Sequence, residues 1–251
     1  MKSIRQNPIR KPGGHFLIPT FFLLLCVAAP IFAADKYLEA SQTGGIALLA
    51  PPPAPDSTEQ AADLASARAV FHGRTADEET RARKDASLTL FNFTPAIGEF
   101  FQPGKLPKLE QFYQDLKPEI KEAITIPKNH WKRKRPYEID SALLLGKPEP
   151  SFSYPSGHSA VGTIQSLLLA EIFPEKREAI LAIGRNIGWD RVIIGKHFPT
   201  DVSAGRVLGQ AIFRELMKSP AFQQNLAEAK AEVQAMRQIQ LDKLEETKVS
   251  Q

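Results

Sequence analysis

The chain has 251 residues, a formal net charge of +4 and a pI near 9.1. Residues 1–34 contain four basic and no acidic residues, whereas the remainder holds 28 of each kind and is formally neutral. Overall charge therefore argues against a general nucleic-acid-binding protein, and any positive field must be confined to a local site. The length suits a single domain.

The first 34 residues are typical of a secretory signal peptide. Four basic residues precede an apolar run over residues 16–32, and Ala33 and Ala34 follow it. We predict cleavage after one of these alanines, a periplasmic or secreted protein, and no stable membrane insertion after cleavage. An uncleaved membrane anchor is the alternative, although the run is short for a span and is interrupted by two prolines. Cys26, the only cysteine, would leave with this segment, so the mature chain must be held by a core without disulfides.

Residues 35–60 are predicted to form an extended, proline-rich arm. Four prolines in residues 50–55 remove backbone donors and impose extended geometry, which excludes a helix there. The arm would lie over the domain or over a neighbouring subunit. A helix capped within the stretch Asp56-Ser57-Thr58 should follow and run to about residue 71.

Residues 61–218 are predicted to form one helical domain. Apolar residues recur at helical spacing and no strand alternation is present, so we expect an all-α fold. The expected helices cover residues 76–102, 108–127, 157–173, 175–192 and 200–217, with a charged, proline-rich loop over 137–152 at the rim of a pocket. Thr200 is predicted to cap the last helix, which places Asp201 in its first turn. The run Lys132-Arg133-Lys134 is interpreted as a solvated face.

The tail over residues 219–251 is predicted to be an amphipathic helix. Its apolar residues recur at alternating spacings of four and three, namely Phe222, Leu226, Ala229, Val233 and Met236. Such a stripe packs either on the domain or on a second copy of the chain, so a homo-oligomer is one of the two expectations.

Residues 128–201 bring together the residue types that in-line attack on a phosphate ester requires. A phosphomonoester carries about two negative charges near neutral pH, and phosphoryl transfer spreads charge over its equatorial oxygens. Lys128, Arg135 and Arg191 would together nearly neutralise such a group. The turn Pro155-Ser156-Gly157 precedes an apolar helical run, and the first backbone N–H groups of a helix favour an anion.

Two histidines, His158 and His197, supply the remaining chemistry. One imidazole would attack the phosphorus and the other would protonate the leaving oxygen. A carboxylate beside the attacking imidazole would fix its tautomer and stabilise the cation formed on attack, and Asp201 stands four residues after His197. This pattern predicts a phosphatase that needs no metal or other cofactor, because the three cations take the role of a metal ion.

Three ordered blocks resemble the signature of the type 2 phosphatidic acid phosphatase superfamily. They are Lys128 with Arg135-Pro136, then Pro155-Ser156-Gly157-His158, then Arg191 with His197 and Asp201. Within that superfamily the chain resembles the bacterial class A non-specific acid phosphatases, from about residue 40 to about residue 217. The resemblance implies a single compact helical domain of the kind shared with vanadium haloperoxidases.

The resemblance also implies a role for each residue of the three blocks. Lys128, Arg135, Ser156, Gly157, His158 and Arg191 would line the phosphate pocket, with His158 as general acid, His197 as nucleophile and Asp201 as its partner. The implied function is a secreted, metal-independent acid phosphatase that hydrolyses small phosphomonoesters, with nucleotides among the candidates, through a phosphohistidine. Activity should be bell-shaped in pH and favour mildly acidic conditions, since His158 must start protonated and His197 neutral.

One position departs from the family pattern and keeps further functions open. The residue before Arg191 is commonly Ser, and here Asp190 would either pair with Arg191 or repel the substrate. Repulsion would leave a catalytically silent protein that binds phosphate or vanadate. A vanadium haloperoxidase and a lipid phosphate or diphosphate phosphatase stay open as well, although membrane-embedded lipid phosphatases need several apolar spans and none follows residue 34.

Overall fold

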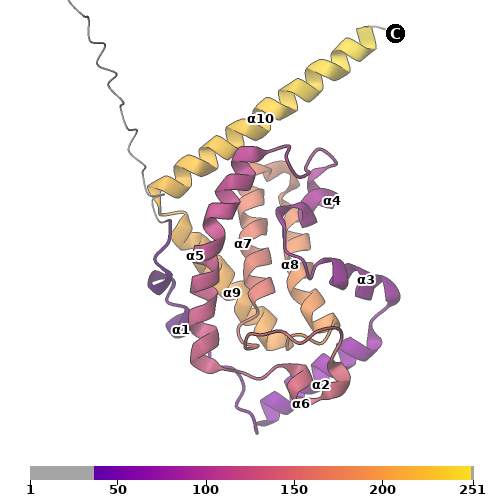
Figure 1. Cartoon of the computed structure of the whole chain (residues 1–251), viewed down its shortest axis with the longest axis vertical. Helices are drawn as coiled ribbons and strands as arrows, with labels where there is room; N and C mark the ends of the chain where they lie inside the picture. Colours follow the sequence, from indigo (N-terminus) through magenta and orange to yellow (C-terminus); the bar gives the residue numbers. More distant parts are fainter. Residues whose placement is uncertain (1–36, 250–251) are drawn as a thin grey trace, which may run out of the picture. The chain divides into compact units, whose positions relative to one another are not determined.

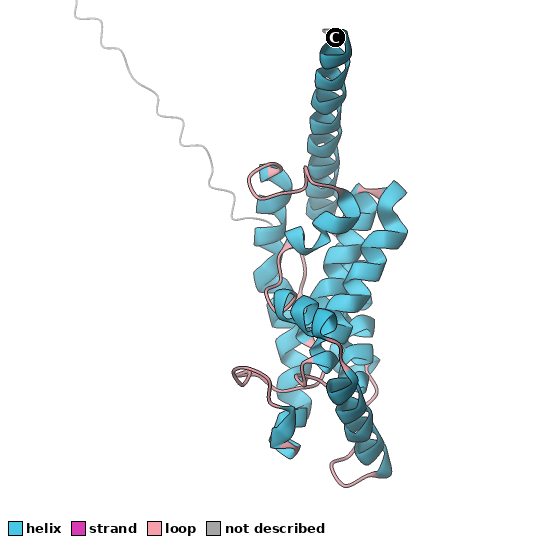
Figure 2. Cartoon of the chain, turned by 90° about the vertical axis from the view of Figure 1, so that its right-hand side faces the viewer, coloured by secondary structure: helices cyan, strands magenta, loops and turns pink. Residues whose placement is uncertain are grey.

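The computed structural model describes residues 37–249, and the predicted signal peptide with Cys26 lies outside them. Every regular element in that range is a helix (Figure 2), which confirms the all-α prediction for the described residues. The elements are η1 (Ala40–Thr43), α1 (Gly45–Leu48), α2 (Thr58–Gly73), α3 (Ala76–Lys84), η2 (Leu90–Phe93), α4 (Thr94–Ile97), α5 (Pro107–Trp131), α6 (Pro136–Ile139), η3 (Ser141–Leu143), α7 (Gly157–Ile172), η4 (Pro174–Lys176), α8 (Arg177–Ile193), α9 (Pro199–Leu216) and α10 (Pro220–Val249). No helix in this range is both long and apolar enough to cross a membrane.

Helix α7 packs closely against both α8 and α9 (Figure 1). Glycines allow this approach, because a Cβ at Gly184 of α8 would lie 2.5 Å from Ser166 Oγ, and one at Gly209 of α9 would lie 2.6 Å from the Ala160 carbonyl oxygen. The Ser156 backbone N–H donates to the Asp201 carbonyl oxygen at 2.9 Å. The start of α7 is therefore fixed beside the start of α9, which brings the second and third sequence blocks together.

Helix α5 is longer than the sequence predicts. The residues with the predicted helical spacing, among them Leu109, Leu116 and Ile120, are buried in the main core. The helix continues past residue 127 and ends where Lys132 adopts a left-handed φ of 49°. Lys128 therefore lies in the last turn of α5, on a rigid element rather than in the loop that follows.

The first part of α10 packs on the domain. Its apolar stripe is buried from Phe222 to Val233, and Met236 packs against the same core. The Glu232 carboxylate accepts hydrogen bonds from the Lys108 and Leu109 backbone N–H groups, at 2.9 and 3.0 Å. These donors lie in the first turn of α5, where a negative charge is stabilising. Intramolecular packing therefore accounts for the stripe.

The described part of the predicted arm, residues 37–60, lies over the domain. Residues 50–55 form no helix, as predicted, although the short elements η1 and α1 precede them and contact α5. The Tyr154 hydroxyl donates to the Ala50 carbonyl oxygen at 2.5 Å, so the arm is anchored beside the second sequence block. Ser57 caps α2 as predicted, accepting the Gln60 backbone N–H at 3.1 Å.

Two predictions of helix limits were wrong. Residues 76–102 are not one helix, because α3 ends at Lys84 and the short elements η2 and α4 stop at Gly98, whose φ is 126°. Thr200 does not cap α9, which begins one residue earlier at Pro199. The Asp201 carboxylate instead accepts the Phe198 backbone N–H at 3.0 Å, so the predicted catalytic carboxylate also holds the start of its own helix.

Candidate active site

A tight loop between α8 and α9 presents His197. The His197 and Lys196 backbone N–H groups both donate to the Arg191 carbonyl oxygen, at 3.2 and 2.8 Å. Gly195 adopts a φ of 69° there, and a side chain at this position would collide with the Leu143 backbone. The loop thus fixes His197 directly behind Arg191, which joins the two ends of the third sequence block.

The contacts of His197 define its tautomer. Nδ1 lies 3.2 Å from Asp201 Oδ2, and Nε2 lies 3.1 Å from Arg135 Nη1. A guanidinium only donates, so Nε2 must carry the lone pair and Nδ1 the proton that faces Asp201. Burial, followed by the nearby Arg135 and Lys128, holds the pKa of His197 well below its usual value. The imidazole is therefore neutral, with an unprotonated Nε2 among the cations.

The sequence interpretation of Arg133 as part of a solvated face is wrong. The charged run predicts a solvated face that includes Lys132 and Lys134, yet Arg133 is 7% exposed. Its guanidinium donates from Nη1 to Asp201 Oδ1 at 2.6 Å and from Nη2 to Asp63 Oδ2 at 2.7 Å. A buried arginine is stable only with such carboxylate partners, and here they come from α9 and α2. Arg133 therefore orients Asp201, which in turn orients His197.

The three predicted phosphate-binding cations converge from three elements. Lys128 comes from α5, Arg135 from the residue before α6, and Arg191 from α8, and each is less than a tenth exposed. Burial, and next the charge of Arg135, lowers the pKa of Lys128 to about 7. Arg191 Nε and Nη1 are buried without a hydrogen-bond partner. Buried unsatisfied donors are costly, so this cluster is organised to receive an anion.

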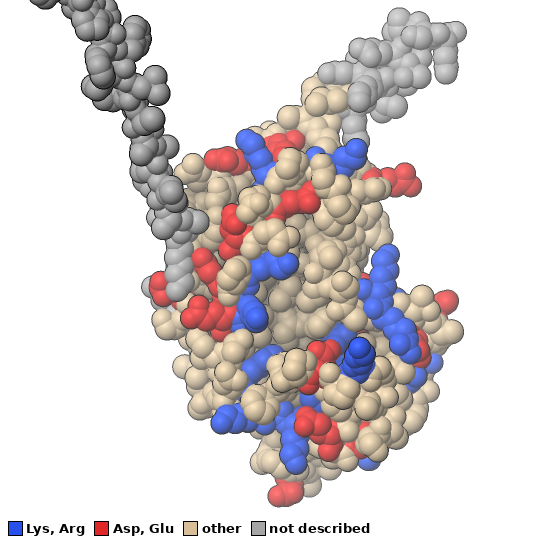
Figure 3. Space-filling view, in the orientation of Figure 1, with Lys and Arg blue, Asp and Glu red and all other residues tan. Residues whose placement is uncertain are grey.

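The positive field of this cluster is local. On the face that Figure 3 shows, Lys and Arg side chains occur together with Asp and Glu side chains, and a wide area between them carries neither. Lys128, Arg135 and Arg191, by contrast, are buried, so their charges are concentrated in the interior. This arrangement agrees with the neutral formal charge of residues 35–251.

Glu149, which the sequence analysis did not single out, occupies part of the cation cluster. Its Oε1 accepts from Arg191 Nη2 at 2.5 Å. Burial alone would raise the pKa of Glu149, but Arg191 and then Arg135 offset burial and hold it below its usual value. The Tyr137 hydroxyl accepts the Glu149 backbone N–H at 2.8 Å and so anchors the loop that carries it. A phosphate that binds Arg191 must therefore compete with this carboxylate.

We expect Glu149→Gln to tighten binding of inorganic phosphate about fivefold, because the neutral amide no longer competes for Arg191. Isothermal titration calorimetry at fixed ionic strength measures this directly. Glu122→Gln, which removes an exposed carboxylate from α5, is the matched control and should leave the affinity unchanged. Equal or weaker phosphate binding by Glu149→Gln would show that the carboxylate does not compete with the anion.

His158 lies in the first turn of α7, on the side of the segment after α3. Its Nε2 is 3.1 Å from the Ala86 carbonyl oxygen, which only accepts, so Nε2 carries the proton of the neutral ring. Nδ1 is then the nitrogen that can take up and deliver a second proton. Burial, and next the charge of Arg191, lowers the pKa of His158 to about 4. Protonation of His158 is thus disfavoured in the free protein, and a bound anion would favour it.

Asp190 faces neither Arg191 nor the cation cluster. Its carboxylate is completely buried and accepts a hydrogen bond from Arg81 Nη2 of α3 at 2.8 Å. Burial, although opposed by Arg81, raises the pKa of Asp190 to about 6. Both sequence-based expectations, pairing with Arg191 and repulsion of substrate, are thus wrong. Asp190 instead attaches α3 to α8.

Ser156 and Gly157 form the start of α7. The Ser156 hydroxyl accepts the Ser159 backbone N–H at 3.3 Å and caps the helix. A Cβ on Gly157 would stand 3.8 Å from Lys128 Cε, so the glycine lies directly beside this cation. Together with His158, the first turn of α7 faces the same region as Lys128.

Comparisons with known proteins show which proteins this chain resembles. Residues 118–224, which include every predicted site residue, match the PAP2 superfamily. The chain is 31% identical to a "Non-specific acid phosphatase" of Salmonella typhi, over 85% of this chain and 90% of the relative. It is 32% identical to a protein of the same name from Salmonella typhimurium, over 74% of this chain and 78% of the relative. A crystal structure of a transmembrane PAP2 type phosphatidylglycerolphosphate phosphatase from Bacillus subtilis superposes with a TM-score of 0.46 and 23% identity, covering 65% of this chain and 87% of that one.

Proposed function

The chain belongs to the PAP2 superfamily, among the bacterial non-specific acid phosphatases, and from this membership we propose that it hydrolyses small phosphomonoesters through a phosphohistidine. The observation that carries the proposal is the state of His197, a neutral imidazole whose Nε2 lone pair lies among Lys128, Arg135 and Arg191. An anion-binding protein has no need of a nucleophile held in this tautomer.

In the first step His197 Nε2 attacks the phosphorus and the P–O bond to the alcohol breaks. Asp201 accepts the Nδ1 hydrogen bond and stabilises the cation that forms on the ring. The departing oxygen takes its proton from His158 Nδ1, which becomes protonated once the bound phosphate adds negative charge beside it. The alcohol leaves, and the phosphoryl group stays on His197.

In the second step water attacks the phosphohistidine and the P–N bond breaks. His158, now neutral, takes the proton of the water, and inorganic phosphate leaves with the proton count restored. Lys128, Arg135 and Arg191 neutralise the equatorial oxygens in both steps, together with the first N–H groups of α7. We propose that no metal ion takes part, because these cations already supply the charge that a metal would supply.

The remaining parts of the proposal concern location and organisation. We propose a periplasmic or extracellular site of action, supported by the signal-peptide pattern in residues 1–34. Cleavage there would leave the arm over residues 35–60, the phosphatase domain over 61–218 and the C-terminal helix over 219–251. We also propose that nucleotides are among the substrates and that the protein forms a homo-oligomer.

The test is hydrolysis of p-nitrophenyl phosphate by the purified protein in excess EDTA. We expect full activity, with kcat falling as pH rises through the pKa of His158 in the substrate complex, because the general acid then loses its proton. KM should rise above about pH 7, where Lys128 loses its charge. Loss of activity in EDTA that zinc or magnesium restores would contradict the metal-free mechanism, and a flat profile across pH 5 to 8 would contradict the role of His158.

A further inference from the structure

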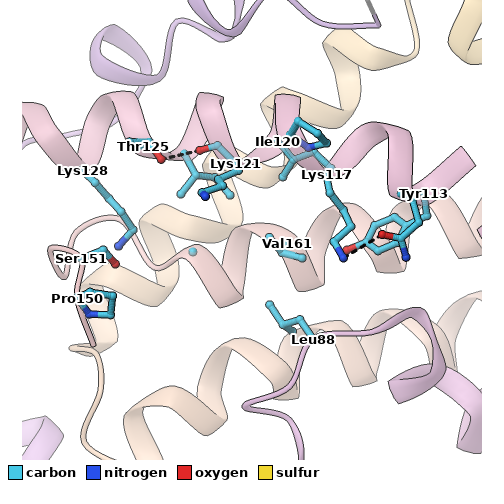
Figure 4. A pocket seen from close by; sticks show the side chains of 14 residues that line it. Leu88, Tyr113, Lys117, Ile120, Lys121, Thr125, Lys128, Pro150, Ser151 and Val161 are labelled. Atoms are coloured by element: carbon cyan, nitrogen blue, oxygen red, sulfur yellow. Dashed lines mark hydrogen bonds between the residues drawn. The ribbon is translucent and has the colours of Figure 1, made fainter. Parts of the chain in front are cut away.

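A groove of about 780 Å³ begins at the phosphate site and follows α5. Lys128 and Gly157, both predicted to line the phosphate pocket, also line this groove. Figure 4 shows α5 along one side, Val161 of α7 on the floor, and Leu88 on the opposite side. Because the groove is continuous with the phosphate site, the natural occupant is the alcohol part of the substrate.

The wall that α5 contributes follows helical spacing. Residues at positions 113, 117, 120, 121, 124 and 128 share one face of the helix, and all of them line the groove. Ile120 faces Val161 and Leu88 across the groove (Figure 4), and Ile124 adds to its apolar lining. The Thr125 hydroxyl in the same groove already donates to the Lys121 carbonyl oxygen at 2.7 Å. The Ser151 hydroxyl, beside Lys128 at the phosphate end (Figure 4), accepts a hydrogen bond from Arg135 Nη2 at 3.2 Å. Both hydroxyls are therefore already hydrogen-bonded within the protein.

Two exposed ammonium groups stand farther along the same wall. Lys121 and Lys117 precede Lys128 by seven and eleven residues, which corresponds to about 10 and about 16 Å along the helix axis. Among the described residues neither forms a salt bridge, and Lys117 Nζ donates only to the Gln114 amide oxygen at 3.1 Å. Both lysines line the groove without a compensating carboxylate.

We propose that this groove binds the alcohol part of the substrate, and that the preferred alcohol has an apolar segment next to the phosphate and a second anionic group beyond it. The inference rests on the proposed phosphatase function. Ile124 and Val161 favour the apolar segment, since a polar sugar there would lose hydrogen bonds to water without replacement. Lys121 and Lys117 favour the distal anion. Such a substrate is a phosphorylated amphiphile with negative charge at both ends.

Three monoesters test the proposal in the full-length protein. They are glycerol 3-phosphate, octyl phosphate below its critical micelle concentration, and 7-carboxyheptyl phosphate, which has the same chain length and a terminal carboxylate. We expect kcat/KM to rise about tenfold from the glycerol to the octyl ester, and about threefold to tenfold more with the carboxylate. Lys117→Gln/Lys121→Gln should abolish only the second increase, and Val161→Thr should reduce only the first.

The control Lys105→Gln/Lys108→Gln removes the same charge from the start of α5 and the turn before it, outside the groove, and should leave all three values unchanged. Equal kcat/KM for the octyl and carboxyheptyl esters, or equal loss in the groove and control variants, would overturn the distal anion subsite. Equal kcat/KM for the glycerol and octyl esters would overturn the apolar subsite. If none of the three esters is hydrolysed, the proposed function itself fails, and the leaving-group role of the groove fails with it.

Discussion

His197→Ala is expected to lower kcat roughly 10⁴-fold or more for an aromatic phosphomonoester, the largest effect of any single substitution in the site. The substitution removes the Nε2 lone pair, and no other described nucleophile is held in the same way between Asp201 and Arg135. Phosphate binding should persist, because Lys128 and Arg191 remain. Steady-state kinetics gives the loss of kcat, and calorimetric titration with phosphate shows whether the anion site is intact.

His72→Ala is the matched control for that substitution. His72 lies exposed in the last turn of α2, so the same change in residue type should leave kcat within experimental error of the unsubstituted protein. If kcat of His197→Ala stayed within about tenfold of the unsubstituted protein, the assignment of His197 as nucleophile would be contradicted. A loss of that size can arise from the cavity that the substitution leaves, whereas loss of the nucleophile lowers kcat far more.

Arg133→Ala is expected to lower the free energy of unfolding by about 3–5 kcal/mol, because it leaves the buried Asp63 and Asp201 carboxylates without their shared cation. It should also lower kcat, since Asp201 would lose the contact that fixes its Oδ1 while Oδ2 faces His197. Urea unfolding followed by circular dichroism measures the first effect. The kinetic assay with p-nitrophenyl phosphate measures the second.

Lys134→Ala is the control from the same cationic run. Lys134 is exposed, so its removal should change the free energy of unfolding by less than about 0.5 kcal/mol. If Arg133→Ala changed the free energy of unfolding as little as Lys134→Ala, the pairing of Arg133 with both carboxylates would not contribute to stability. Arg133 would then behave like a residue of a solvated face.

The sequence predicted the parts of the site that depend on local pattern. Helical spacing identified α5, α7, α8 and α9, because apolar residues on one face of a helix recur with its period. The three blocks predicted Lys128, Arg135, Arg191 and the two histidines as site residues, and the fold brings these side chains near one another. His197 and Asp201 are four residues apart, so their contact could be anticipated from spacing alone.

The missed residues depend on contacts between segments far apart in the chain. Arg133 lies within a run of charges, and only the packing of α2 and α9 around it shows that it is buried. Glu149 belongs to a loop without periodicity, so nothing in the sequence indicated that it reaches Arg191. Asp190 occupies a position that the family pattern gives to another residue, and its partner Arg81 is 109 residues away. A pattern along the chain cannot specify such pairs.

The protonation of His158 shows a further limit of sequence reasoning. The residue type allows a general acid, yet the pKa follows from burial and from Arg191, which lower it to about 4. In the proposed mechanism, the charge of the substrate supplies the stabilisation that makes the acid available. Similar reasoning applies to Lys128, whose pKa of about 7 would rise when the phosphate binds.

The stereochemical course at phosphorus tests the central claim most directly. A monoester of chiral thiophosphate, hydrolysed in isotopically labelled water, gives a thiophosphate whose configuration can be determined. Each in-line displacement inverts the configuration, so attack by His197 followed by attack of water predicts overall retention. Inversion would mean that water attacks the ester directly, and would contradict a phosphohistidine intermediate.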